Sequence, residues 1–324
     1  MSKKTFYIIL TALAGLIIIG LLIWYFVLKP QEAVTPATGV DFTVPGQIKN
    51  SANLKIISEG PVLSLSKNNE VILFYDFKGQ LWQLNEAEEK TTLSSQAPIE
   101  NLTEIIWPKV FSPDGKKIVY QKNNGLFTSD SSGKNQRTLI SDLKLKDIIL
   151  KWPNTNTLAL ISKPSGLLAG GLWFLDVRNL GIRKIISNFG LEILFAPDGN
   201  SFIYSYTDQN GKNPVLAVYD KKGDQKIISN VSTLVDKCAF TKDLINIYCA
   251  VPKLWSDFAV LPDDYYKNAF STSDDIWKIN TETGEKTLVL KYTGGISNLA
   301  VSSDENHIFF ISKDNQFLYK LNLK

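Results

Sequence analysis

The sequence predicts an all-β protein: a six-bladed β-propeller that is closed by an N-terminal strand and preceded by one transmembrane helix. Three observations lead to this prediction. Residues 6–28 form one long uncharged apolar run. A hairpin pattern then recurs from residue 62 to the C-terminus. Finally, residues 53–60, just before the first hairpin, have the character of a strand that the last repeat lacks.

The apolar run has the length of a transmembrane helix. Residues 6–28 contain no charge, and a helix over Phe6–Val27 would be roughly 33 Å long, enough to cross the core of a bilayer. A cleaved signal peptide is the alternative, but its apolar region is usually about 7–15 residues and ends at small side chains. Lys3 and Lys4 precede the run, so the positive-inside rule predicts a cytoplasmic tail over residues 1–5.

Residues 29–51 contain three prolines among small and polar residues, and we interpret them as a Pro-rich linker. With the tail inside, the chain after the linker is placed on the far side of the membrane. The predicted localisation is therefore the cell membrane, with a single span and with the propeller domain, residues 52–324, outside the cytoplasm.

From residue 50 onward, short runs of β-branched and aromatic residues alternate with clusters of Gly, Asn, Asp and Ser, as in strands and turns. A hairpin such as KVFSPDGKKIVYQ (109–121) recurs in six copies, clearly so in ILFAPDGNSFIYS (193–205). The apolar residue before the turn recurs at intervals of 41–46 residues, with one interval of 61. A period of about 40–50 residues is typical of a propeller with one four-stranded blade for each repeat. The six positions are Leu65, Phe111, Trp152, Phe195, Phe240 and Val301.

The last repeat ends after NQFLYKLNLK, one strand short of a blade. The segment NLKIISEG (53–60) resembles the fourth strands of the other repeats. We therefore expect this N-terminal strand to complete the last blade, because closing the ring removes an exposed β edge.

The segments FSPDGKKIVY and FAPDGNSFIY resemble the repeat of TolB-like and related WD-type β-propeller proteins, over the whole region after the linker. Two copies are clear and four are degenerate. The segment LPDDYYKNAFSTSDDIW is similar to one in a group of uncharacterised, membrane-anchored bacterial propeller proteins. The resemblance implies a scaffold for binding partners more often than an enzyme, although a fold alone assigns no function.

The aspartates of the repeat are explained by its turns. Proline presets φ at the second turn position, aspartate accepts hydrogen bonds from the turn backbone, and glycine adopts positive φ. We therefore interpret Asp114, Asp198, Asp243 and Asp304 as turn formers rather than catalytic residues.

The two cysteines, Cys238 and Cys249, lie in the fifth hairpin. If Phe240 pairs with Ile247, the cysteines also lie opposite each other, with Cβ atoms about 4.5–5.5 Å apart. Both a disulfide and two packed apolar thiols fit this geometry. No metal site is predicted, because the single histidine, His307, is far along the sequence from both cysteines.

The sequence carries no motif for nucleophilic catalysis, phosphate binding or a calcium loop. His307 lies in a hairpin, where we interpret it as a surface residue. We predict neither a catalytic residue nor a cofactor. The net charge of +3 is too small, and the basic residues are too scattered, to indicate nucleic acid as a partner.

The long interval before the last hairpin comes from an insertion, residues 251–275, between the second and third strands of blade five. Blade three has a shorter insertion, 163–171, at the same place. Loops at this place emerge at one mouth of a propeller, and binding residues concentrate on such loops. The alternative is that the aromatic residues pack the loop onto the blades. The candidate binding residues are Trp255, Asp257, Asp263, Asp264, Tyr265 and Tyr266.

Our leading hypothesis is a membrane-anchored, extracytoplasmic propeller that binds an envelope protein, peptide or glycan without catalysis. The alternative is a glycan- or peptide-processing hydrolase that uses Asp263, Asp264 or Asp274, since glycosidases need two carboxyl groups about 5–10 Å apart. A third interpretation is a spacer within a larger membrane assembly.

Overall fold

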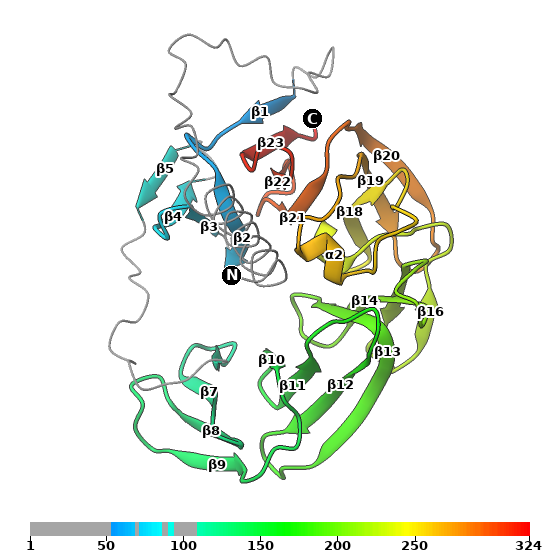
Figure 1. The fold of residues 1–324 in the computed structure, drawn as a ribbon. Coiled ribbons are helices and arrows are strands. Elements are labelled where there is room, and N and C mark those ends of the chain that lie inside the picture. Colours follow the sequence, from blue (N-terminus) through cyan, green and yellow to red (C-terminus); the bar gives the residue numbers. More distant parts are fainter. Residues whose placement is uncertain (1–52, 69–70, 86–89, 94–108) are drawn as a thin grey trace, which may run out of the picture. The chain divides into compact units, whose positions relative to one another are not determined.

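The computed structural model describes residues 53–68, 71–85, 90–93 and 109–324, all within the unit Ile48–Lys324. These residues form an all-β domain of five sheets (Figure 1). Two four-stranded sheets come first along the chain. Their strands are β2 (Val62–Asn68), β3 (Val71–Asp76), β4 (Leu81–Asn85) and β5 (Lys90–Leu93), then β6 (Lys109–Phe111), β7 (Lys117–Lys122), β8 (Gly125–Asp130) and β9 (Arg137–Ile140).

A seven-stranded sheet and a four-stranded sheet follow. The four-stranded sheet is preceded by the short helix η2 (Val235–Lys237), and the insertion between β18 and β19 contains the helix α2 (Asp263–Tyr266). The strands of the larger sheet are β10 (Ile148–Asn154), β11 (Thr157–Ser162), β12 (Ala169–Asp176), β13 (Ile182–Phe195), β14 (Phe202–Thr207), β15 (Val215–Tyr219) and β16 (Gln225–Ile227). Those of the smaller sheet are β17 (Cys238–Phe240), β18 (Asn246–Pro252), β19 (Asp274–Asn280) and β20 (Lys286–Lys291).

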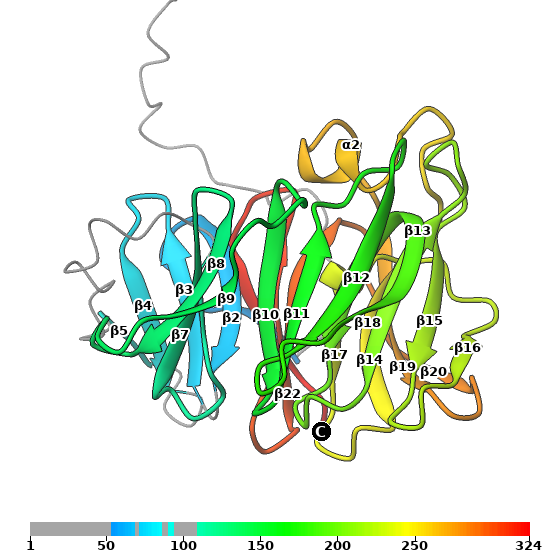
Figure 2. The same ribbon diagram turned by 90° about the horizontal axis from the view of Figure 1, so that it is seen from below.

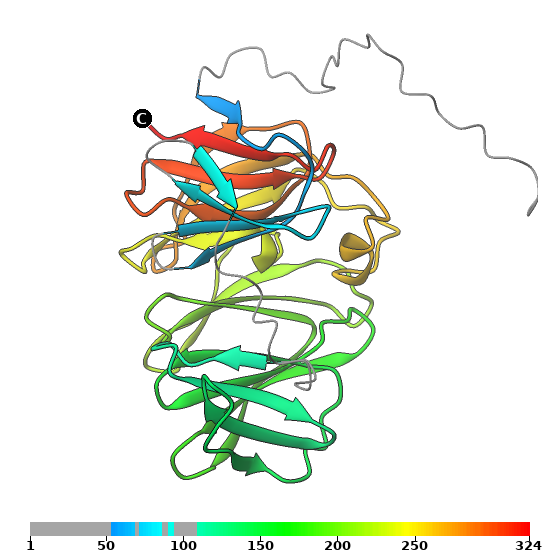
Figure 3. The same cartoon turned by 90° about the vertical axis from the view of Figure 1, so that its left-hand side faces the viewer.

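The last sheet joins the two ends of the domain. Its strands are β21 (Ile296–Val301), β22 (His307–Ser312) and β23 (Leu318–Asn322), and β1 (Leu54–Ile56) pairs with β23 at the outer edge (Figures 1 and 3). The pairing is antiparallel, with Leu54 opposite Leu321. The expected N-terminal strand therefore lies beside the C-terminal sheet.

The expectation of six separate sheets is corrected to five, because β13 runs without a turn from one blade into the next. Its first half pairs with β12 and its second half with β14. Gly190 lies between the two halves with φ of +59°, where a Cβ would come within 2.6 Å of the Thr207 hydroxyl. The third and fourth repeats thus share one continuous strand.

Apolar clusters connect the sheets in series. Each sheet has two apolar faces. The central strands β11 and β22 are buried on both faces, whereas β3 of the first sheet buries only one. Five clusters lie between neighbouring blades. The first packs β2–β5 against the last sheet, the second packs the last sheet against β17–β20, and the third packs β17–β20 against β13–β16. The remaining two pack β13–β16 against β10–β13, and β10–β13 against β6–β9. Among the described residues, no cluster joins β2–β5 to β6–β9.

The role predicted for the repeat aspartates is confirmed. In the first clear copy, the Asp114 carboxylate accepts hydrogen bonds from the Ser112 hydroxyl at 2.6 Å and the Lys116 amide at 3.1 Å, and Gly115 has φ of +68°. In a degenerate copy, Asp304 accepts equivalent bonds while Glu305 adopts the positive φ. The aspartate thus keeps the turn even where glycine is missing.

The predicted transmembrane helix is corrected. In the described part of the chain, no helix is long and apolar enough to cross a membrane, and η2 and α2 have only three and four residues. The described residues thus form an all-β fold, and the predicted cell-membrane localisation is not supported. The predicted tail (1–5), span (6–28) and linker (29–51) lie outside the described residues.

The β1–β23 pairing makes a stability prediction. The Ile57 amide donates to the Leu318 carbonyl at 2.9 Å, just beyond β1. We expect Ile57→Pro to lower the free energy of unfolding by about 1–3 kcal/mol more than Ile57→Val, since both trim the side chain but only proline removes this donor. Urea unfolding of the full chain measures the difference. Equal destabilisation by the two variants would contradict the pairing.

Candidate functional site

Three loops from neighbouring blades meet at one end of the sheets. The Gly166 amide, in the β11–β12 loop, donates to the Asp263 carboxylate at 2.7 Å, and the Leu261 amide donates to the Gly211 carbonyl at 2.8 Å. A Cβ on Gly166 would lie 2.2 Å from the Leu261 carbonyl oxygen, so only glycine fits this approach. Figure 2 shows α2 at this end of the domain. The two insertions therefore share one rim, as the loop positions predict.

Much of the long loop is packed against the blades. Tyr265 is buried with Leu234, Ala259 and Leu261, and Trp255 borders the same cluster. The Trp255 indole donates to the Ser232 carbonyl at 3.2 Å. The alternative in which the aromatic residues fasten the loop therefore describes these two rings well.

The loop carboxylates have three different surroundings. Asp263 accepts the Gly166 amide, whereas Asp264 accepts the Val260 amide at 2.8 Å and lies 3.7 Å from the Lys267 ammonium. Asp257 is exposed. Asp263 and Asp264 therefore stabilise the loop conformation.

Asp274 begins β19 and is fully buried with Lys237 of η2. The two side chains form an ion pair at 2.5 Å, and Lys237 also donates to the Ile296 carbonyl at 2.7 Å. The Ile296 amide donates to the same Asp274 oxygen at 2.7 Å. A buried charge pair of this kind is costly to break from one side, so it locks the blades carrying these residues together.

A second buried carboxyl group, Glu192 of β13, contacts the loop from the neighbouring blade. It is 5% exposed and accepts hydrogen bonds from the Tyr266 hydroxyl and, at 3.2 Å, from the Ser205 hydroxyl. Burial raises the pKa of Glu192 to about 8; the bond from Tyr266 opposes this rise and the charge of Asp236 adds to it. Glu192 is therefore largely neutral at pH 7.

A pocket of about 210 Å³ opens beside these groups. Asp236 and Lys313 are its charged residues, and Tyr265, Tyr266 and Asn298 are among its polar ones. The Asp236 carboxylate accepts the Tyr265 hydroxyl at 2.8 Å and the Asn298 amide at 3.2 Å, so both of its oxygens are engaged. The pocket draws its walls from β2, the β3–β4 turn, η2, the long loop and the last sheet.

Lys313, in the β22–β23 turn, fastens the loop and faces the pocket. Its ammonium donates to the Tyr265 carbonyl at 2.8 Å and lies 3.5 Å from the centroid of the Tyr265 ring. Burial, aided by the charge of Lys237, lowers the pKa of Lys313 to about 8.

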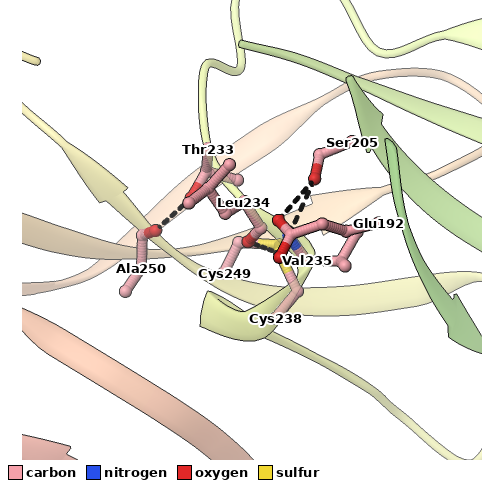
Figure 4. Close-up of a disulfide and its surroundings, with 8 residues drawn as sticks. All are labelled: Glu192, Ser205, Thr233, Leu234, Val235, Cys238, Cys249 and Ala250. Atoms are coloured by element: carbon pink, nitrogen blue, oxygen red, sulfur yellow. Dashed lines mark hydrogen bonds between the residues drawn. A yellow bond between two sulfur atoms is a disulfide. The ribbon is translucent and has the colours of Figure 1, made fainter. Parts of the chain in front are cut away.

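A disulfide joins Cys238 of β17 to Cys249 of β18 (Figure 4). The two residues are opposed in the β17–β18 register, with Cα atoms 4.1 Å apart. Cys238 directly follows η2, and the Val235 amide of η2 donates to Ser205, the partner of Glu192. The bridge therefore ties η2, and with it Asp236, to β18.

Of the six candidate residues, Tyr265 and Tyr266 line the pocket, whereas Trp255, Asp257, Asp263 and Asp264 do not. The sequence analysis missed Glu192, Asp236 and Lys313. Glu192 left a usable signal, since it is a charged residue inside the apolar run FGLEILF. Lys313 resembles any lysine in a hairpin turn.

The fold and the pocket together define a β-propeller protein with a polar, loop-walled mouth. No protein-family model matches the chain, and no curated protein matches it. Among solved structures, an oligogalacturonate lyase in complex with manganese is similar, with a TM-score of 0.51 and 14% identity over 83% of this chain and 79% of that one. The oligogalacturonate lyase of Vibrio parahaemolyticus is similar with a TM-score of 0.50 and 10% identity, over 83% of this chain and 80% of that one.

A putative TolB from Agrobacterium tumefaciens is also similar, at a TM-score of 0.47 and 11% identity over 83% of this chain and 94% of that one. The two lyase structures support a β-propeller fold for this chain. Nothing supports the expected resemblance to a membrane-anchored group. At these identities the similarity shows the fold alone.

Glu192 makes the stability of the protein depend on pH. Its pKa is raised from the ordinary 4.5 to about 8, so the native state holds a proton that the unfolded chain has released, and stability falls as pH rises through this window. Between pH 4.5 and 9 we expect the wild type to lose roughly 3–5 kcal/mol of unfolding free energy through this group, and Glu192→Gln to lack this loss. Urea unfolding at pH 5, 7 and 9 tests this. Parallel pH profiles for the two proteins would contradict it.

The disulfide contributes to stability by restricting the unfolded chain. Its cysteines are separated by 11 positions, for which we expect the double variant Cys238→Ala/Cys249→Ala to lose about 3 kcal/mol of unfolding free energy. Urea unfolding with and without a reductant measures it. The reductant should destabilise the wild type and leave the double variant unchanged; a reductant effect on both would assign the loss to another cause.

Proposed function

We propose that this chain is a non-enzymatic binding module that holds a protein, peptide or glycan ligand at the mouth formed by its long loops. The proposal does not include the membrane placement corrected above. The observation that supports it best is the fixed long loop, which walls a pocket of about 210 Å³ instead of filling it.

The loop is preorganised for binding. Polar contacts hold it to the β11–β12 loop through Asp263, to η2 through Tyr265, to β13 through Tyr266 and to the last sheet through Lys313. A surface that is already ordered loses little conformational entropy when a ligand binds. Rigid loops on a scaffold are the usual carriers of binding residues.

The loop also exposes large apolar side chains. Leu254 is 77% and Phe258 94% exposed, while Leu167 and Leu168 are exposed on the shorter insertion. Exposed apolar residues gathered on neighbouring loops are typical of interaction surfaces. They give these loops an apolar contact area for a macromolecule.

The hydrolase alternative receives no support from the loop geometry. Asp263 and Asp264 accept backbone amides, and Asp274 is enclosed with Lys237. His307 lies 3.6 Å from the turn residue Asp304, which is bound to its own turn. These groups have structural partners that account for their positions.

The proposal is tested by screening the full chain against a displayed random-peptide library and a glycan array. We expect ligands whose affinity falls at least about tenfold in Ser297→Trp, which places a bulky ring in the mouth pocket. The matched control is Lys116→Trp in the β6–β7 turn, which should bind like the wild type. Absence of any ligand, or equal binding by all three proteins, would refute the proposal.

A further inference from the structure

A second and larger pocket adjoins the mouth pocket. It measures about 320 Å³ and lies between residues 58–62, which connect β1 to β2, and the side chains of β3 and β4. Phe74 and Trp82 form its aromatic wall, with ring centroids 6.4 Å apart and ring planes 9° from parallel. The Trp82 indole N–H donates to Asp76 at 2.9 Å, so its polar atom is satisfied and the rings offer an apolar surface.

The two pockets are neighbours in space. Val62 and Phe77 line both of them, and Phe77, in the β3–β4 turn, is 52% exposed. The β3–β4 turn is the counterpart in the first blade of the two long insertions. The two pockets therefore meet at these two residues.

The mouth pocket carries a cation without a carboxylate partner. Within the described residues, no carboxylate oxygen lies within 4 Å of the Lys313 ammonium, which contacts a carbonyl and a ring face. Of the other nearby charges, Lys237 is paired with Asp274, whereas Asp236 accepts two neutral donors, keeps its negative charge and attracts Lys313 at longer range. An anionic group entering the pocket would find Lys313 as its natural partner.

We propose that the two pockets form one site for a small amphipathic carboxylate, whose charged group contacts Lys313 and whose apolar body lies against Phe74 and Trp82. The larger pocket alone reaches the size range of small-molecule sites, about 300–1,000 Å³. An apolar lining with a few placed polar groups is the usual composition of such sites. The apolar body can be aromatic or aliphatic, and the probes below separate the two.

This inference goes beyond the proposed function, since it adds a small-molecule ligand to a mouth proposed for macromolecules. It depends on Lys313 and Phe77, whereas the test of the proposed function depends on Ser297. The two can therefore fail separately.

The test is calorimetric titration of the full chain with matched pairs of ligands: 3-phenylpropionate and 3-phenylpropanamide, and octanoate and octanamide. At pH 6.5 we expect the carboxylate of the better-binding pair, aromatic or aliphatic, to bind at least about tenfold more tightly than the matching amide. Lys313→Gln, which keeps a donor for the Tyr265 carbonyl, should bring this ratio close to one. Lys116→Gln, an exposed lysine in the β6–β7 turn, should leave it unchanged. Phe77→Ser should weaken acid and amide alike.

A second measurement needs no variant. Because the pKa of Lys313 is lowered to about 8, the preference for the carboxylate should be largely lost at pH 9.5 in the wild type. Equal affinity for acid and amide at pH 6.5, or a preference that persists in Lys313→Gln or at pH 9.5, would overturn the proposal. Unchanged affinities in Phe77→Ser would overturn the joining of the two pockets.

Discussion

The structure depends on one constraint, namely that each small sheet has two apolar faces and cannot cover either by itself. Ile72, Leu158 and Phe309 are fully buried only because a neighbouring sheet lies against them. Burial of apolar area is the main favourable term in folding, so the sheets must pack in series. The pairing of β1 with β23 meets the same need. It places an N-terminal strand on the last sheet, and the first sheet, which follows β1 in the chain, packs against the last sheet.

Packing in series also explains why the charged groups gather at one mouth. The loops that connect second and third strands emerge together there, and they bring polar side chains from several blades to one place. Asp236, Lys237, Asp274 and Lys313 come from three different repeats or connections. Each is held by a partner from another segment, and these contacts add to the small apolar cluster around Tyr265 in making the mouth rigid.

The repeat, its turns and the strand supplied by the N-terminus could be predicted because they rest on local chemistry and a fixed period. Asp114 and Gly115 specify their turn whatever lies around them. The continuous strand β13 could not be foreseen. The segment FGLEILF looks like the first strand of a new hairpin, so the sequence does not show that it continues the strand before it. Of the residues that line the pocket, Tyr265 and Tyr266 were named in advance from the length and composition of their loop. Lys313 was not, because its role arises from burial beside Tyr265, which the linear sequence does not show.

The unbroken course of β13 has a mechanical consequence. In a ring of separate blades, neighbours are linked by side-chain packing and a flexible connection, so one blade can open while the next stays intact. Here a single hydrogen-bonded ladder runs from β10 to β16, and fraying on one side of Gly190 loosens the strand that the other side needs. We therefore expect these seven strands to unfold as one cooperative unit, with Glu192 in its central strand.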